Sequence, residues 1–293
     1  MTRMQTWGGV AGKRVVITGA TNGIGLAAAV ELARRGAMLT LVARSESRAA
    51  DAVGRIRATE GASVDVVLAD LASQVDVRRL ATDLLAKYPR IQVLVNNAGA
   101  VYAARQLSPD GIELTWALNH LAPFLLTTLL LDRLKASAPA RIVTTSSGAH
   151  QGATIPFDDL TANRGAAGSG FPRYGQTKLA NILFTAELAR QLEGSGVTAN
   201  AYHPGFVASG FNRNSGLLMR VGMALTRPFA RSARKGAETL VWLVDSEDAG
   251  QYSGGYFFDR RPVTPSAAAQ DAQAAQRLWR LSEDEVAATA PGL

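Results

Sequence analysis

A tyrosine and a lysine lie four positions apart at the start of an apolar helical pattern, in the run Tyr174-Gly175-Gln176-Thr177-Lys178. Residues at i and i+4 share one face of a helix, so both polar heads can reach the same cleft. A phenol ordinarily titrates near pH ~10, and a neighbouring ammonium group favours the phenolate and lowers the pKa of the phenol. The pair can therefore deliver or accept a proton at a carbonyl or alcohol oxygen. The spacing alone is common by chance, but Ser146-Ser147 ends an upstream strand pattern, where a hydroxyl would line the same crevice.

A glycine-rich turn lies between a β-branched run at 14–18 and a helical pattern at 26–35. Its glycines allow a tight turn and bring backbone N–H groups close to a pyrophosphate, and the helix N-terminus adds donors and a partial positive charge. The spacing G-x-x-x-G-x-G lacks the Gly-Lys-Ser/Thr ending of a P-loop, which argues against an ATPase. The candidate dinucleotide-binding residues of this turn are Gly19, Thr21, Asn22, Gly23, Ile24 and Gly25.

The residues after the next two strand patterns bear on the choice of dinucleotide. A NAD site would carry an acidic residue here for the ribose 2′-hydroxyl, whereas this chain has Ala43 and Arg44. A guanidinium fork suits a 2′-phosphate, so the sequence favours NADP (NADPH) over NAD, although Arg44 could also be an ordinary surface arginine. Asp70 and Leu71 follow the third strand, where an adenine would reach, although Asp70 could equally cap a helix.

Apolar runs of strand length alternate with helical patterns along the chain. They lie at 14–18, 38–43, 64–68, 93–96, 142–146 and 197–202, with a weaker one at 255–258. Such strands, separated by amphipathic helices, predict an α/β fold with a single Rossmann-type doubly wound parallel sheet of about seven strands and helices on both faces. No linker divides the chain. We therefore expect one catalytic domain over 1–293, with a substrate-covering insertion at 205–235 and a C-terminal helical tail at 266–293.

The composition narrows the classes of function. Hydrophobic residues make up 47% and charged residues 19% of 293, which predicts a large core rather than disorder. The absence of cysteine excludes thiol nucleophiles and Cys-ligated metals, and three dispersed histidines argue against any metal site. The net charge of +7 comes from scattered arginines, which favours a solvated surface over nucleic-acid binding. No apolar stretch of signal-peptide or membrane-span length is found, so the expected location is cytoplasmic.

Taken together, the motifs resemble the short-chain dehydrogenase/reductase family. The matching elements span nearly the whole chain at the family's spacing: Thr18 to Gly25, Asp70, Asn96 to Gly99, Asn119, Ser147, Tyr174 to Lys178, and Pro204-Gly205. Within the family, the sequence most resembles the retinol-dehydrogenase-like group. That likeness rests on Leu118 to Leu121, Ser146 to His150, Ile155 to Phe157, Lys178 to Asn181, His203 to Gly205, Gly255 to Phe257, and the tail run Arg277-Leu278-Trp279.

The resemblance implies roles for the proton-transfer residues. Tyr174 would be the general acid/base, and Lys178 would lower its pKa and hold the nicotinamide ribose. Ser147 would hydrogen-bond the substrate oxygen, while Ser146 would be structural. Asn119 would keep a water in the proton relay to Lys178.

The resemblance also implies cofactor contacts, which fall on Asn97, Ala98, Gly99, Pro204, Gly205 and Val207. A Thr or Ser usually follows the Pro-Gly pair by three residues, but this chain has Ala208, so Ser209 would have to make that contact shifted by one residue. The histidines flank family motifs and are expected to make structural hydrogen bonds: His120, His150 and His203.

The substrate is expected to be a small carbonyl or alcohol compound. The segment 205–235 is rich in apolar residues, which suits a lipophilic substrate, although the same residues could simply pack on the core. Its arginines leave peripheral membrane contact open as a minor alternative. The rival function is a catalytically silent dinucleotide-binding sensor or scaffold. A nucleic-acid binder rests on charge alone, and no nucleic-acid partner is expected.

A homo-oligomer is expected from two helices, at 111–134 and 174–192, that carry more apolar surface than one sheet face needs. In many members of the family, helices at these places pair across a two-fold axis. Leu125, Leu129 and Phe184 would then lie in the interface. The alternative is a monomer whose surface faces a membrane or another partner.

Overall fold

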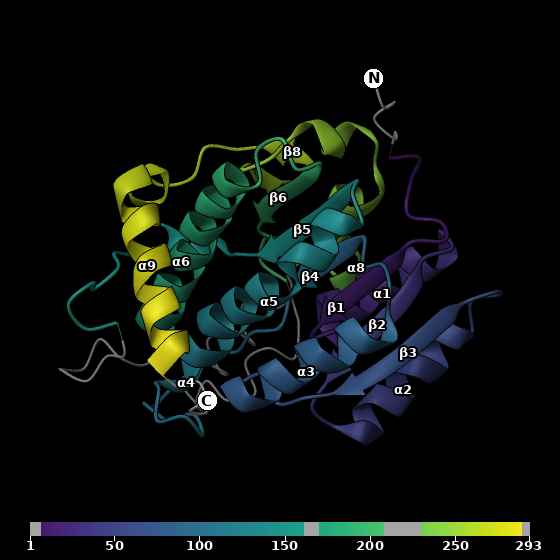
Figure 1. Cartoon of the computed structure of the whole chain (residues 1–293), viewed down its shortest axis with the longest axis horizontal. Coiled ribbons are helices and arrows are strands. Elements are labelled where there is room, and N and C mark those ends of the chain that lie inside the picture. Colours follow the sequence, from purple (N-terminus) through teal and green to yellow (C-terminus); the bar gives the residue numbers. More distant parts are fainter. Residues whose placement is uncertain (1–6, 161–169, 208–229, 289–293) are drawn as a thin grey trace.

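Eight strands form one sheet in the order β3-β2-β1-β4-β5-β6-β7-β8 in the computed structural model of this chain, which describes residues 7–160, 170–207 and 230–288 (Figure 1). The strands are β1 (Arg14–Thr18), β2 (Met38–Ala43), β3 (Ser63–Leu68), β4 (Val93–Asn96), β5 (Ala140–Thr145), β6 (Val197–Tyr202), β7 (Tyr256–Phe258) and β8 (Arg261–Pro262). Strands β1 to β7 are parallel, and β8 pairs antiparallel with β7. The predicted fold class is confirmed. The extra strand β8 consists of two exposed residues, so no apolar run in the sequence predicts it.

Helices cover both faces of the sheet, as predicted. One face carries α1 (Gly23–Arg34), α2 (Glu46–Arg57) and α8 (Ala233–Asp245). The other carries α3 (Gln74–Lys87), α5 (Ala122–Ala136) and α6 (Gly170–Gln191). The tail helix α9 (Ala272–Ala288) lies alongside α6, at the outer end of that layer (Figure 1).

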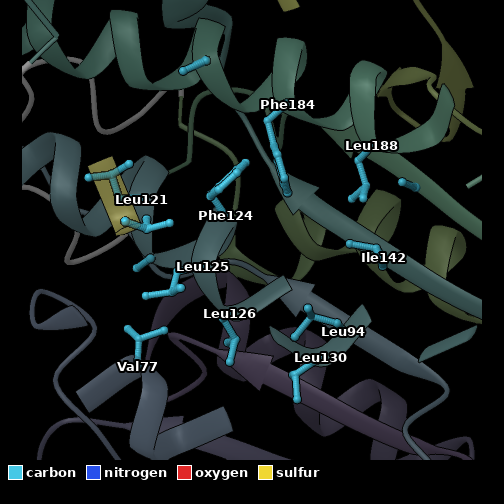
Figure 2. Packing of buried hydrophobic residues seen from close by; sticks show 14 of the residues in the cluster. Val77, Leu94, Leu121, Phe124, Leu125, Leu126, Leu130, Ile142, Phe184 and Leu188 are labelled. Atoms are coloured by element: carbon cyan, nitrogen blue, oxygen red, sulfur yellow. The ribbon is translucent and has the colours of Figure 1, made fainter. Parts of the chain in front are cut away.

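The larger part of the core lies between the sheet and the helices α3, α5 and α6. Figure 2 shows Leu94 and Ile142 of the sheet facing α5 and α6 side chains such as Leu130 and Leu188. A second core cluster fills the opposite face under α1 and α8. Burial on both faces explains why the central strands read as near-continuous apolar runs rather than as alternating patterns.

The continuous helical stretch Leu114–Ala136 is long and apolar enough to cross a membrane by length and composition alone. However, 72% of its most apolar window is buried inside the protein. It comprises α4 (Leu114–Trp116), a π-helical turn (Ala117–Leu121) and α5. Packing against the sheet, α3 and α6 accounts for its apolar character.

The tail helix α9 covers the surface on which the sequence placed an oligomer interface. The Trp279 ring stacks on that of Phe184 with centroids 5.8 Å apart and meets Phe124 edge-on at 5.0 Å. Phe184 and Leu125 each keep only 2% of their surface exposed within a single chain. Placing these two residues in an interface was therefore wrong, because the chain's own tail and core satisfy their apolar surface. The homo-oligomer itself stays a prediction.

Candidate active site

The carboxyl ends of β1 and β4 lie side by side where the strand order reverses, and the glycine-rich turn leaves the sheet there. Gly19 has a φ of +68°, and a Cβ on it would lie 2.7 Å from Ala98 Cα. A Cβ on Gly25 would overlap the Gly19 carbonyl oxygen and lie 2.5 Å from Asn97 Nδ2. The turn is thus folded against the segment after β4. We call Thr18–Gly25 together with 97–99 the cofactor cradle.

The first turn of α1 offers backbone N–H groups to an anion. Asn22 stands at the N-cap in an extended conformation, and its side chain caps none of them. Gly23, with a φ of +53°, begins the helix directly after it. Uncapped N–H donors at a helix N-terminus, beside glycines that leave room, fit the pyrophosphate of a dinucleotide.

Asn97 holds the cradle together from within. Its side-chain amide donates to the backbone oxygens of Thr18 at 3.0 Å and Gly19 at 3.1 Å. The Thr18 hydroxyl in turn accepts the backbone N–H groups of Asn97 and Ala98, both at 3.0 Å. The side chain of Asn97, predicted to line the cofactor, therefore fixes the turn that would bind it.

Arg44 lies exposed at the end of β2, and its positive charge acts on Tyr102, a residue that the sequence interpretation missed. Burial raises the pKa of Tyr102, so it stays a neutral phenol beside the guanidinium. Asp70 is not the N-cap of α3, because Ser73 takes that position. Asp70 instead accepts the backbone N–H of Ala72 at 3.0 Å, which leaves it after β3 as predicted. The neighbouring Leu71 is half-buried against the core.

The Pro-Gly segment after β6 reaches the cradle through the start of α8. A Cβ on Gly236 would lie 2.7 Å from Val207 Cγ2, 3.3 Å from Ile24 Cγ1 and 3.5 Å from Pro204 Cβ. Predicted cofactor-binding residues of the glycine-rich turn and of the Pro-Gly segment therefore converge around one glycine. Gly205, with a φ of +77°, supplies the turn between Pro204 and Val207. The Ala208–Ser209 contact and most of the predicted lid at 205–235 lie outside the described residues.

Tyr174 and Ser147 meet across a close packing contact between α6 and the loop after β5. The Tyr174 phenol hydrogen-bonds the Ser147 side chain, and the tyrosine is only 8% exposed. A Cβ on Gly175 would lie 2.6 Å from the Ala149 carbonyl oxygen, so only glycine lets α6 approach this closely. The predicted structural role of Ser146 agrees with its hydroxyl donating to the Lys178 carbonyl at 2.7 Å.

Burial sets the protonation of Tyr174 and Lys178, and it opposes the expectation that Lys178 lowers the pKa of Tyr174. Desolvation raises the pKa of Tyr174 to about 12, although its bond to Ser147 opposes the shift. Desolvation also lowers the pKa of Lys178 to about 7, so the lysine is a weaker source of positive charge than predicted. The Lys178 ammonium lies 5.4 Å from the centroid of the Tyr174 ring and donates to the Thr145 carbonyl at 2.9 Å. The phenol is therefore held as a neutral acid.

Asn119 lies close to Lys178, beside Gly99. Its Oδ1 accepts the Ala100 N–H at 2.9 Å, and its Nδ2 donates to the Ala100 carbonyl and the Thr177 hydroxyl. A Cβ on Gly99 would lie 3.2 Å from Asn119 Oδ1 and 3.5 Å from Lys178 Nζ, so the three predicted residues share one narrow space. We call Asn119, Ser147, Tyr174 and Lys178 the proton-transfer cluster.

The π-helical turn that carries Asn119 has a local cause. Pro123 has no N–H to donate to the Asn119 carbonyl four residues back, and its ring would clash with that carbonyl in a regular α-helix. The wider turn at Ala117–Leu121 relieves the clash and aims Asn119 at Ala100. The proline was the signal in the sequence that could have located this bulge.

A buried ion pair, which the sequence interpretation missed, braces the two helices that bear the cluster. Arg173 Nε donates to Glu113 Oε2 at 2.8 Å, and neither side chain is exposed. Glu113 also accepts the backbone N–H groups of Thr115 and Trp116, each at 2.9 Å, at the start of the helix leading to Asn119. Arg173 directly precedes Tyr174, so the pair fixes the helix that bears Tyr174 to the helix that bears Asn119.

Comparisons with known proteins agree with this geometry. The short chain dehydrogenase family model matches residues 13–217. Retinol dehydrogenase 12 of Mus musculus is 44% identical over 93% of this chain and 86% of its own length. A Streptomyces sp. (strain C5) protein, DnrU, to which daunorubicin C-13 ketoreductase activity is provisionally assigned, is 41% identical over 97% of this chain and 96% of its own.

Among solved structures, a short chain dehydrogenase from Burkholderia cenocepacia J2315 in complex with NADP superimposes with a TM-score of 0.68 at 27% identity, covering 84% of this chain and 96% of the other. The solved structure and the sequence relatives therefore indicate the same fold and the same family for this chain. The chain belongs to the short-chain dehydrogenase family of oxidoreductases, and within it to the retinol-dehydrogenase-like group.

Proposed function

We propose that this protein is an NADP-dependent carbonyl reductase that converts a lipophilic aldehyde or ketone to an alcohol. The observation that carries the proposal is the Tyr174 phenol, which is buried, neutral and hydrogen-bonded to Ser147. A pKa of about 12 keeps the proton on the phenol at neutral pH, which suits a proton donor. Alcohol oxidation would need the phenolate, which burial disfavours.

The cluster assigns one task to each side chain. The nicotinamide of bound NADPH would supply the hydride to the carbonyl carbon. Ser147 and Tyr174 donate hydrogen bonds to the carbonyl oxygen, and Tyr174 gives up its proton as negative charge develops there. Lys178, with a pKa of about 7, can pass a proton toward Tyr174. Asn119 places a polar side chain in the space beside Lys178 Nζ.

The preference for NADP rests on Arg44. Its guanidinium is exposed at the end of β2, beside the phenol of Tyr102. No carboxylate follows β2 at the position where a ribose 2′-hydroxyl would be read. A planar guanidinium in this place favours the 2′-phosphate.

The lipophilic substrate is supported by two exposed aromatic side chains, one of which lies beside Tyr174. Phe171 is 53% exposed, with its ring 5.9 Å from that of Tyr174, and Phe206 in the Pro-Gly segment is 45% exposed. Exposed apolar side chains of this size suit an apolar ligand. The names of the relatives, which refer to retinol and daunorubicin, suggest the same class of compound.

The test follows the absorbance of reduced nicotinamide with NADPH or NADH and a panel of carbonyl compounds, from retinal and aromatic ketones to small hydrophilic aldehydes. We expect turnover with NADPH and the lipophilic members, and a shift toward NADH in Arg44→Asp. An equal or better kcat/KM with NADH in the unmodified protein would overturn the NADP assignment. Nucleotide binding without turnover on any carbonyl would favour the dinucleotide-binding sensor instead.

A further inference from the structure

His150 connects the catalytic serine to the C-terminal tail. Its Nε2 lies 3.2 Å from the backbone N–H of Ser266, and its Nδ1 lies 2.8 Å from the Ser147 carbonyl oxygen. A backbone N–H can only donate, so Nε2 is the acceptor and the ring proton is on Nδ1, where it donates to Ser147. Burial lowers the pKa of His150, which is 1% exposed, so the ring stays neutral.

His120 connects the asparagine side of the cluster to the same tail. Its Nε2 lies 2.8 Å from the Ser282 hydroxyl, which is completely buried on α9. With the Ser282 proton assigned to the Leu278 carbonyl at 2.8 Å, the hydroxyl oxygen accepts and His120 carries the ring proton on Nε2. Burial lowers the pKa of His120 to about 3.

The His120 ring lies between the tail and the catalytic lysine. It follows Asn119 directly in the π-helical turn, and its other side faces the Asn181 amide. Asn181 Nδ2 lies 3.3 Å from the Thr145 carbonyl oxygen, the same atom that holds Lys178 Nζ. Glu285 of α9 anchors α4, directly before that turn, by accepting the indole N–H of Trp116 at 3.0 Å.

We propose that the segment from Ser266 to Ala288 is a positioning element of the active site, which sets Ser147 through His150 and sets Asn119 and Lys178 through His120. The inference deepens the proposed reductase function and rests on it. The two histidines touch no reacting atom, so they act only through the catalytic residues they hold. Opposite ring tautomers are the signature of the arrangement, because one ring accepts from the tail and the other donates to it.

The first experiment records long-range proton–nitrogen NMR spectra of the histidine rings in the full-length protein. Only three histidines contribute signals. We expect His150 to hold its proton on Nδ1, and His120 to hold its proton on Nε2. Rings that exchange freely between tautomers, or that share the same one, would overturn the proposal. This readout needs no substrate, so it still tests the two contacts if the proposed reductase activity fails.

The second experiment separates positioning from stability by kinetics. Ser266→Pro removes the donated N–H at a φ of −58°, which proline tolerates, whereas Ser266→Ala keeps that N–H as the matched control. Misplacing a catalytic group by about 1 Å can cost about 10²-fold in rate. We expect kcat to fall ~10-fold in Ser266→Pro, with NADPH affinity unchanged and Ser266→Ala near the unmodified enzyme.

Ser282→Ala tests the second contact, with Val286→Ala as its control, because Val286 is also a buried side chain on α9. Ser282→Ala should lower kcat more than Val286→Ala does at equal loss of thermal stability. In a Ser147→Ala background, Ser266→Pro should add no further loss, since the group it positions is gone. A full additional loss there, or kcat effects that merely follow stability, would overturn the inference while leaving the reductase function standing.

Discussion

The cofactor cradle and the proton-transfer cluster lie at the same edge of one sheet, but they are built in opposite ways. The cradle depends on missing side chains: Gly19 and Gly25 bring backbone against backbone, and a methyl group on either would collide with a neighbour. The cluster depends on buried polar side chains, among them Lys178 at 2% exposure and the fully buried pair of Arg173 and Glu113. One region is specified by shape and the other by hydrogen-bond partners.

The difference predicts how each region fails. Added bulk should damage the cradle, because its backbone atoms have nowhere to move. Loss of a partner should damage the cluster, because each buried polar group that loses its partner keeps its full desolvation penalty.

The largest effect is expected for Tyr174→Phe, which removes one hydroxyl from the cluster. Turnover should fall by about 10⁴-fold, the upper end of what general acid catalysis supplies, because Ser147 cannot replace the phenol as the acid. NADPH affinity and folding should persist. Tyr252→Phe, which alters a phenol packed against Trp242 and Phe257 away from the cluster, serves as the control. Steady-state kinetics decide, and a Tyr174→Phe enzyme with near-normal kcat would remove this residue from the mechanism.

The next effect concerns stability. Glu113→Gln leaves the Arg173 guanidinium charged and buried without its carboxylate, and breaking such a pair costs about 3–5 kcal/mol. The exposed pair of Arg277 and Asp158 gives the contrast, because Arg277→Ala should cost less than about 1 kcal/mol. Urea unfolding of both variants measures the difference. Equal losses would show that burial does not distinguish the two ion pairs.

The sequence identified the cradle more completely than the cluster's supports, and the reason is physical. A tight turn between a strand and a helix requires glycine for local backbone reasons. Gly19 and Gly25 could therefore be recognised from the sequence without knowing which residues they contact. Tyr174 and Lys178 were visible because one helix fixes their spacing. The partners Glu113 and Arg173 are 60 residues apart, and only the folded chain brings them together.

Burial was the other quantity that the sequence could not supply. The lysine beside Tyr174 was expected to lower the tyrosine pKa, but both groups lie so deep that desolvation outweighs their mutual influence. The sequence showed that the helix bearing Phe184 has an excess of apolar residues. It did not show that α9 covers this apolar surface. Long-range packing determined both the pKa values of Tyr174 and Lys178 and the covering of Phe184.

A third prediction adds bulk to the cradle. Gly25→Ala places a methyl group against the Gly19 carbonyl and the Asn97 amide, and overpacking of this kind costs about 1–3 kcal/mol. The turn should shift, and NADPH affinity should fall by about tenfold or more as its N–H groups move. Gly54→Ala is the control, because no atom lies within 4 Å of the added Cβ. Calorimetric titration with NADPH compares them, and unchanged binding in Gly25→Ala would contradict the role of shape.

The last effect is a pH dependence of stability that comes mainly from the cluster. Desolvation lowers the pKa of Lys178 from 10.5 to about 7 in the folded protein. Between these values the unfolded chain binds the extra proton, so stability should rise with pH, by up to about 1.4 kcal/mol per pH unit. Below pH ~7 the cost of the buried charge is fully present and constant. Above pH ~10 the raised pKa of Tyr174 acts with the opposite sign, because the unfolded tyrosine ionises first.

Urea unfolding of nucleotide-free protein at pH ~7, 8 and 9 isolates this window. Lys178→Met should remove most of the rise, because the variant has no proton to release at this site, and the smaller rise that remains comes from Lys13, whose pKa burial also lowers. Lys235→Met, at an exposed position on α8, should retain it. A rise of the same slope in Lys178→Met would mean that the buried lysine is not the group responsible. The cradle, which carries no buried charge of this kind, should contribute nothing to the slope, so Gly25→Ala should lower stability equally at every pH in this range.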